Sequence, residues 1–233
     1  MNIINGRKLS KMVILFDLDG TLIDSTDAIL STFHHACELH KFQKVTDEEI
    51  MSLIGYPLDI MFKSVGVSDD KVWDFVSSYK EEYRKISTQK TLLLASAKEA
   101  VIKASEFATL GIVTTKTGRY SEVLMEYFEL MRYFDVLIGR EHVENPKPHA
   151  EPILKAMEQL DTENKEIWMV GDTKLDLISA KNANVNSIGV LSGYGDENEL
   201  KQFGDIVLDD VLQAVNYLKS RKKQHTSGTY KII

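Results

Sequence analysis

Short apolar segments recur along the chain and alternate with segments of helical periodicity. One helical stretch follows Ser96 and Glu99, which have the spacing of a capping box. Strands that alternate with helices are typical of an open α/β sheet, so we predict an α/β fold with a Rossmann-like parallel core. The segments apolar enough to be strands buried on both faces are 12–16, 108–114, 136–139, 167–170, 187–191 and 205–208.

One long region interrupts this alternation. Between about residues 25 and 94 we find no convincing strand, whereas apolar residues recur at helical spacing within 29–40 and 72–86. Thr46 and Glu49 again have the spacing of a capping box. We therefore predict a discontinuous α/β core at 1–24 and 95–219, and an inserted α-helical cap domain at 25–94. Residues 220–233 are predicted to form a mobile basic tail.

Composition narrows the class of protein. Lys and Arg total 28 against 35 Asp and Glu, and a net charge of -7 disfavours binding to nucleic acid. Cys37 is the only cysteine, which excludes an intramolecular disulfide and fits a reducing compartment. No segment approaches the roughly 18 apolar residues of a spanning helix, and the N-terminus lacks the apolar core of a signal peptide. We expect a cytoplasmic protein that binds no membrane.

The clearest chemical signal is a pair of aspartates after the first predicted strand. Asp17 ends that strand, and Asp19 stands two positions further on, beside Gly20, which allows a sharp turn. Residues i and i+2 of an extended chain point the same way, and ligands of open α/β sheets bind where strands end. Such close carboxylates need a proton or a cation between them, and Mg²⁺ suits oxygen ligands best. Alone, these residues also fit a polar loop with capping aspartates.

A second acid pair follows another predicted strand. The strand at 167–170 leads directly to Asp172, and Asp176 falls in the first turn of a helix that we expect to begin near Thr173. If the strands are parallel, both acids lie at the same edge of the sheet as Asp17. A favourable interaction with the helix dipole would also explain Asp176, but it explains Asp172 less well.

Two further strand ends carry groups that can hold a phosphate. Thr114 and Thr115 follow a strand and offer hydroxyls near a helix start, although threonine is also common at such caps. Lys147 lies before Pro148, which suits the first position of a helix, so the lysine is held in the preceding loop. Together with the two acid pairs, these residues indicate a phosphate site at one edge of one sheet.

These motifs resemble those of the haloacid dehalogenase (HAD) superfamily of phosphohydrolases. The resemblance extends from about Met12 to Leu218, and the helical insertion resembles the α-helical cap of subfamily I. Two further segments, IGYPL and GVLSGYG, resemble the branch of phosphoglycolate phosphatases and pyrophosphatases. The four motifs that carry the resemblance are DLDGTLID (17–24), VTTK (113–116), PKP (146–148) and GDTKLD (171–176).

The resemblance implies roles for the residues that react with or hold the substrate. Asp17 would be the nucleophile that becomes an aspartyl-phosphate, and Asp19 would act first as general acid and then as general base. Thr114 and Lys147, with Thr115 beside them, would hold the phosphoryl group. The acid at Asp19 also excludes a haloacid dehalogenase proper, whose chemistry dispenses with an acid at this position.

The resemblance also implies a metal site. Mg²⁺ would be bound by the carboxylates of Asp17 and Asp172 and by the backbone carbonyl of Asp19. Asp176 would support the site by orienting the metal ligands or Lys147.

The expected function is a Mg²⁺-dependent phosphatase that hydrolyses a small, phosphoglycolate-like phosphorylated metabolite through an aspartyl-phosphate. The alternatives are an inorganic pyrophosphatase of the same family, a sugar-phosphate mutase and a non-catalytic protein that binds a phosphorylated metabolite.

Two other features of the sequence receive simpler interpretations. Lys116 is interpreted as a solvated lysine, and the aromatic residues Trp73, Tyr79 and Tyr83 as helix packing.

Overall fold

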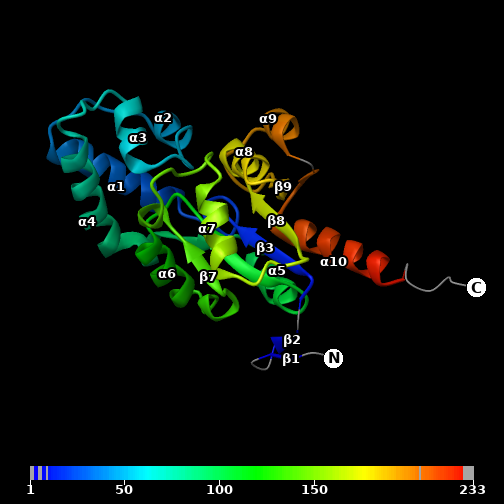
Figure 1. Ribbon diagram of the computed structural model, residues 1–233. Helices are drawn as coiled ribbons and strands as arrows, with labels where there is room; N and C mark the ends of the chain where they lie inside the picture. The colour runs from blue at the N-terminus through cyan, green and yellow to red at the C-terminus, as the bar shows by residue number, and fades with distance from the viewer. Residues whose placement is uncertain (1–2, 5–6, 9, 205, 228–233) are drawn as a thin grey trace, which may run out of the picture.

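The computed structural model describes residues 3–4, 7–8, 10–204 and 206–227, and its centre is a sheet of six parallel strands (Figure 1). The strand order is β10-β9-β8-β3-β6-β7. Each strand matches a predicted apolar segment with ends that differ by one residue at most, which confirms the Rossmann-like α/β fold. The strands are β3 (Met12–Phe16), β6 (Thr109–Val113), β7 (Val136–Ile138), β8 (Glu166–Gly171), β9 (Asn186–Val190) and β10 (Ile206–Leu208).

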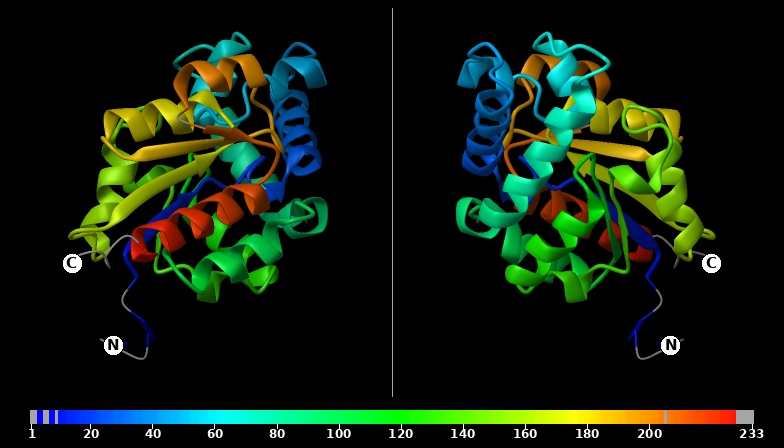
Figure 2. Two further views of the ribbon diagram at one scale, coloured as in Figure 1. Left: turned by 90° about the vertical axis from the view of Figure 1, so that its right-hand side faces the viewer. Right: turned by 90° about the vertical axis from the view of Figure 1, so that its left-hand side faces the viewer.

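Helices cover both faces of this sheet (Figure 2). Ile14 and Phe16 of β3 belong to one apolar cluster, and Val13 and Leu15 belong to another, because successive strand residues point to opposite faces. The first cluster includes residues of α5 (Ala97–Ser105), α6 (Gly118–Tyr127) and α10 (Val211–Ser227), and the second includes residues of α7 (Glu151–Gln159) and α8 (Lys174–Asn182). Burial on both faces explains why the strands lack polar alternation.

The C-terminal helix extends further than expected. The predicted mobile tail begins at residue 220, but α10 continues to Ser227. Residues 228–233 of that tail lie outside the described part of the chain.

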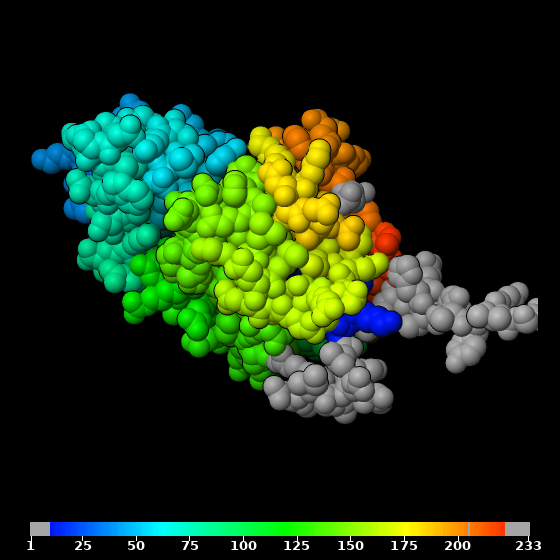
Figure 3. All heavy atoms as spheres, in the orientation of Figure 1, coloured from blue at the N-terminus to red at the C-terminus, as the bar shows by residue number. Residues whose placement is uncertain are grey.

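The inserted region is a helical unit with its own apolar cluster. Its members include Phe33, Phe62 and Phe75, and the rings of Phe33 and Phe62 are stacked with centroids 4.2 Å apart. These helices form a separate lobe at the upper left of Figure 3, in blue to teal. They are α1 (Thr26–Leu39), α2 (Asp47–Met51), α3 (Leu58–Ser64) and α4 (Val72–Lys90).

A short ribbon joins the insertion to the core. β4 (Ile23–Asp24) pairs antiparallel with β5 (Leu92–Leu93), where the chain leaves the core and returns to it. The expectation of no strand within 25–94 is therefore wrong at β5, because two residues are too short to show a strand period.

The two capping boxes had different outcomes. The box of Thr46 and Glu49 is confirmed, with both reciprocal hydrogen bonds present. The box of Ser96 and Glu99 is wrong, since the Ser96 side chain makes no cap hydrogen bond. Ser96 has φ -97° and ψ -5°, whereas a capping residue normally has extended backbone.

The remaining described elements are short. They are β1 (Ile3–Ile4), β2 (Arg7–Lys8), α9 (Glu197–Phe203) and the 3₁₀ turns η1 (Met131–Tyr133) and η2 (Arg140–His142).

A hydrophobic span long enough to cross a membrane is absent from every helix within the described residues. The cytoplasmic location stays a prediction.

Candidate active site

The strand order brings together residues that are far apart in the sequence. β3 lies between β8 and β6, so Asp17, Asp172 and Thr114 follow three neighbouring strands at the same edge of the sheet. The chain continues its ladder just beyond β3, where Asp17 N donates to Val170 O at 2.9 Å. Because this backbone is held by sheet hydrogen bonds, the Asp17 carboxylate projects from a rigid support.

Three buried carboxylates form the centre of the site. Oxygen atoms of Asp17, Asp172 and Asp176 all lie within 4.8 Å of one another. Asp172 accepts hydrogen bonds from Thr21 Oγ1 at 3.1 Å and from Tyr194 N at 2.8 Å. Asp17 is buried as well, and its Oδ1 lies 2.9 Å from Lys147 Nζ. The cluster thus holds three carboxylates close together beside Lys147.

Lys147 is the cation within this cluster. Its Nζ lies 2.9 Å from Asp17 Oδ1, contacts Asp176 Oδ1, and donates to Val113 O at 3.1 Å. Burial lowers the pKa of Lys147, but the charges of Asp17 and Asp176 outweigh burial and raise it above its usual value. Lys147 therefore stays protonated.

The helix after Lys147 starts later than expected. We predicted Pro148 at the first helical position, but α7 begins at Glu151, with Pro152 in its first turn. That prediction is wrong, although Lys147 does lie in the preceding loop.

Asp176 is held by the start of α8. Thr173 is the N-cap, and Asp176 Oδ2 accepts from Thr173 N at 3.1 Å and from Thr173 Oγ1 at 2.8 Å. The other oxygen of Asp176 contacts Lys147. The predicted helix start and first-turn position of Asp176 are confirmed. Both oxygens of Asp176 are thus engaged, one by the N-cap of α8 and the other by the Lys147 cation.

The electrostatics of the cluster favour a bound cation. Burial raises the pKa of Asp17 to about 7, an effect that Lys147 opposes and that Asp176 and Asp19 reinforce. Burial also raises the pKa of Asp172 well above its usual value, and the charges of Asp17 and Asp176 add to this. A divalent cation restores the ionised forms, and hard oxygen ligands suit Mg²⁺. Three buried carboxylates face one lysine here, so the cluster carries excess negative charge and its oxygen ligands fit Mg²⁺.

Asp19 has different partners. Ser25 Oγ donates to Asp19 Oδ1, and Lys116 Nζ lies 3.1 Å from the same oxygen. Lys116 also donates to Tyr83 OH of α4 at 3.0 Å, and its side chain is only 8 % exposed. The interpretation of Lys116 as a solvated lysine is therefore wrong. Its sequence signal was its position in the loop that follows Thr114.

The two threonines point to different partners. Thr114 is buried, and its Oγ1 accepts from Lys116 N at 3.2 Å, which leaves its own proton for another acceptor. Thr115 Oγ1 donates to Gly55 O, at 2.8 Å, and so links the core to the helical insertion. Thr115 thus offers no hydroxyl proton to a phosphate in this arrangement. The roles of both residues as phosphate ligands stay predictions.

Gly20 allows the loops of the site to approach each other. Its φ is +81°, and a Cβ at this position would lie 2.6 Å from Asp172 Cγ and 2.9 Å from Gly193 Cα. Its carbonyl accepts from Ser192 Oγ at 2.8 Å. Both the positive φ and the close contacts require glycine here.

Sequence reasoning missed several supporting groups. Thr21, Ser25 and Tyr194 each donate to an aspartate of the site. Serine and threonine are common in turns, so Thr21 and Ser25 carried no separate signal. Tyr194 donates through its backbone N–H, which no side-chain pattern reveals.

Comparisons with known proteins agree with this geometry. The family model described as "Haloacid dehalogenase-like hydrolase" matches residues 14–190. Pyrophosphatase PpaX of Halalkalibacterium halodurans is 33% identical over 191 residues, which cover 82% of this chain and 88% of the relative. The protein named "Probable phosphatase IndB" of Dickeya dadantii is 32% identical over 212 residues, covering 88% of this chain and 92% of its own.

A solved structure extends the likeness to the whole fold. A haloacid dehalogenase-like family hydrolase from Streptococcus pneumoniae superimposes with a TM-score of 0.80 at 24% identity, covering 89% of this chain and 98% of the other. The family match contains Asp17, Asp19, Thr114, Lys147 and Asp172 within its span. This chain belongs to the haloacid dehalogenase-like hydrolase family.

Proposed function

We propose that the chain is a Mg²⁺-dependent phosphatase that transfers the phosphoryl group of a small phosphate ester first to Asp17 and then to water. The observation that carries this proposal is the buried cluster in which Asp17 lies 2.9 Å from Lys147 Nζ and close to Asp172. A carboxylate fixed at the end of a strand can attack phosphorus, and the adjacent cation attracts an anionic substrate.

Asp19 would move the protons in this reaction. It stands two positions after Asp17 in the first motif, and its carboxyl group is held separately by Ser25 and Lys116. These contacts fix the position of the group, which would protonate the leaving oxygen and then take a proton from the attacking water. Lys147 and Thr114 would hold oxygens of the phosphoryl group, where fixed donors stabilise charge that develops during transfer.

The metal would be held by Asp17 and Asp172, together with the backbone carbonyl of Asp19. When bound, Mg²⁺ supplies positive charge that lowers the repulsion between these carboxylates and the phosphate. Asp176 would position Lys147 through their direct contact.

The helical insertion would act as a cap. We assign the core to residues 1–24 and 95–219 and the cap to residues 25–94. The two-strand ribbon of β4 and β5 would then be the connection about which the cap opens and closes. The hydrogen bond from Thr115 to Gly55 O supports this, since it joins the two units at the site.

Pyrophosphate hydrolysis is a second candidate function. The relative of Halalkalibacterium halodurans that is 33% identical is named a pyrophosphatase, and this name favours pyrophosphate as a substrate of this chain too. Pyrophosphatase and phosphatase activity would use the same transfer to Asp17 and would differ only in the leaving group.

Removal of the metal tests the proposal. Hydrolysis of 4-nitrophenyl phosphate should require Mg²⁺ and stop in EDTA, and Mg²⁺ should raise the melting temperature by several degrees. In Asp172→Asn, Mg²⁺ should no longer raise it, and in EDTA the variant should melt at or above the wild-type temperature. Asparagine retains partners for Thr21 and Tyr194 but removes a buried, repelled charge. Full activity in EDTA, or a wild-type Mg²⁺ shift in Asp172→Asn, would contradict the metal site.

Loss of Lys116 should slow the reaction itself. In Lys116→Met, Asp19 loses its ion pair and the Tyr83 hydroxyl loses its donor, so we expect kcat to fall about 10- to 100-fold. Lys165→Met is the matched control. The Lys165 side chain is also only 8 % exposed and is paired with Asp161, but Lys165 precedes β8 at the opposite edge of the sheet. The role is refuted if the two variants retain equal kcat.

A further inference from the structure

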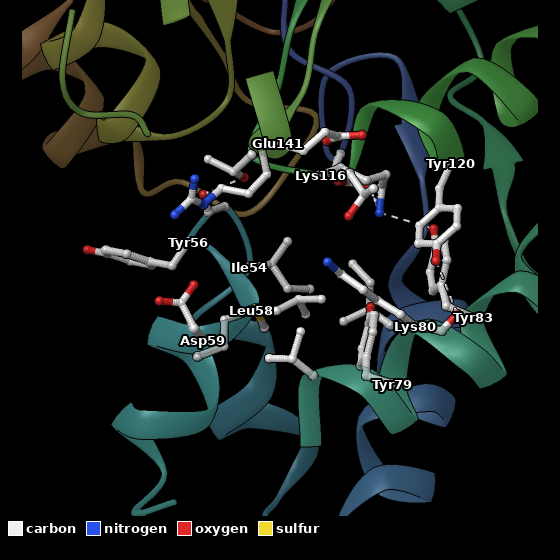
Figure 4. A pocket seen from close by; sticks show the side chains of 18 of the residues that line it. Ile54, Tyr56, Leu58, Asp59, Tyr79, Lys80, Tyr83, Lys116, Tyr120 and Glu141 are labelled. Atoms are coloured by element: carbon white, nitrogen blue, oxygen red, sulfur yellow. Dashed lines mark hydrogen bonds and ion pairs between the residues drawn. The ribbon is translucent and has the colours of Figure 1, made fainter. Parts of the chain in front are cut away.

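A cavity of about 240 Å³ lies between the helical insertion and the core. On the core side it is lined by Asp19, Thr115 and Lys116, and on the other side by residues of the insertion such as Ile54 and Tyr79 (Figure 4). Asp19, which would protonate the leaving oxygen, lines this cavity, so the leaving group of a substrate would extend into it.

The insertion gives this cavity a wall that is rich in apolar side chains. Ile54, Leu58, Met61 and Val76 line it from the insertion, and Tyr120 adds an aromatic ring from the core. Orthophosphate, which is the leaving group of pyrophosphate, has no apolar surface to bury against such a wall. An organic leaving group gains roughly 25 cal/mol for each Å² of apolar surface that it removes from water.

The cavity also contains two cations that lack an acidic partner. The Lys80 ammonium points into the cavity in Figure 4, and no ion pair joins it to an acid among the described residues. Arg140, which also lines the cavity, donates from Nη1 to Val143 O at 2.9 Å and is likewise without an acidic partner there. Unpaired cations in an enclosed site attract an anion.

Three acids line the cavity, and none of them forms an ion pair with Lys80 or Arg140 within the described part of the chain. Glu141 accepts from Gly118 N at 2.7 Å and from Arg119 N at 3.3 Å. Asp59 lies beside Tyr56, across the cavity from Lys80 (Figure 4). Asp19 is already paired with Lys116.

We propose, on the basis of the phosphatase function above, that the substrate is a phosphate monoester of an aromatic or branched aliphatic alcohol that carries a second anionic group. The apolar wall holds the body of the alcohol, and Lys80 and Arg140 bind its anionic group. In the first step the bond between phosphorus and the alcohol oxygen breaks, a bond from Asp17 to phosphorus forms, and Asp19 gives its proton to the leaving oxygen. In the second step Asp19 takes a proton from water, the water oxygen forms a bond to phosphorus, and the bond between phosphorus and the Asp17 oxygen breaks to release phosphate.

Three substrates test this assignment. 4-Carboxyphenyl phosphate carries a carboxylate as its second anionic group. 4-Carbamoylphenyl phosphate has the same shape but an uncharged amide in place of that carboxylate. Pyrophosphate has no apolar group. We expect kcat/KM for the carboxyl compound to exceed that for the carbamoyl compound about tenfold, as one charge-assisted hydrogen bond provides. Both should exceed pyrophosphate. A preference for pyrophosphate, or equal values for the two aryl phosphates, overturns the assignment.

Substitution of Lys80 locates the anion site. In Lys80→Met, the ratio of kcat/KM between the carboxyl and carbamoyl compounds should fall towards one. Lys85→Met is the control on the same helix, because Lys85 is 58% exposed and paired with Glu82 at 3.1 Å. It should keep the wild-type ratio. A wild-type ratio in Lys80→Met overturns the assignment.

The pattern of results separates the two proposals. If none of the three compounds is hydrolysed, or if hydrolysis persists in Asp17→Asn, the phosphatase function fails and this assignment fails with it. If aryl phosphates are hydrolysed in an Asp17-dependent reaction without preference for the carboxyl compound, only the assignment of the leaving group fails.

Discussion

Replacing Asp17 with asparagine should lower kcat/KM for aryl phosphates by about three orders of magnitude or more, because an amide oxygen is a far weaker nucleophile than a carboxylate. The measurement is phosphate release from 4-nitrophenyl phosphate at saturating Mg²⁺. Rapid acid quenching followed by mass spectrometry should detect one added phosphoryl group on the wild type and none on Asp17→Asn.

Two controls make this result specific. Asp161→Asn alters an exposed aspartate whose partner, Lys165, lies away from the site, and it should retain wild-type kcat. Asp17→Asn should also remain folded, since the substitution removes a buried charge rather than a packed side chain. Near-normal turnover in Asp17→Asn, or a phosphoryl group found on another residue, would exclude the aspartyl-phosphate mechanism.

Replacing Lys147 with methionine should remove both activity and stability. The substitution leaves Asp17 and Asp176 buried without their cation, and breaking such a pair typically costs about 3–5 kcal/mol. We expect this loss in the free energy of unfolding, measured with urea in EDTA. Activity should fall by about two orders of magnitude or more, because the phosphoryl group loses its fixed positive charge.

A second substitution distinguishes charge from packing. In Lys147→Met/Asp176→Asn, one of the two unpaired carboxylates is gone, so part of the lost stability should return while activity stays low. Lys155→Met is the exposed control, because its pair with Glu151 at 3.3 Å is solvated and contributes less than about 1 kcal/mol. If the double variant is no more stable than Lys147→Met, repulsion between buried carboxylates is not the cause.

The strands could be predicted because their signal is local. Residues 12–16 and 167–170 are continuous apolar runs of strand length, and burial on both faces of a parallel sheet requires such runs. β5 was missed because two residues carry no period. The capping box at Ser96 failed because a cap depends on the backbone angles of one residue, which neighbouring packing sets.

The acids of the candidate site could be predicted from the sequence, whereas the residues that hold them in place were harder to predict. Asp17, Asp172 and Lys147 could be selected because their motifs, taken together, place charged groups near the ends of strands of one predicted sheet. Lys116 could not be selected, because a lysine near a strand end is usually solvated. Its burial depends on Tyr83, which comes from a helix more than thirty positions away in the sequence.

The sequence by itself determined which segments are strands, where the helical insertion interrupts them, and which charged and hydroxyl residues stand at strand ends. These properties follow from short-range patterns of burial and turn chemistry. Only the tertiary structure decided that β3 lies between β8 and β6, that Lys147 pairs with both Asp17 and Asp176, and that Asp19 and Lys80 line one cavity. Those relations depend on the order of strands and on the packing of distant helices, which no local pattern specifies.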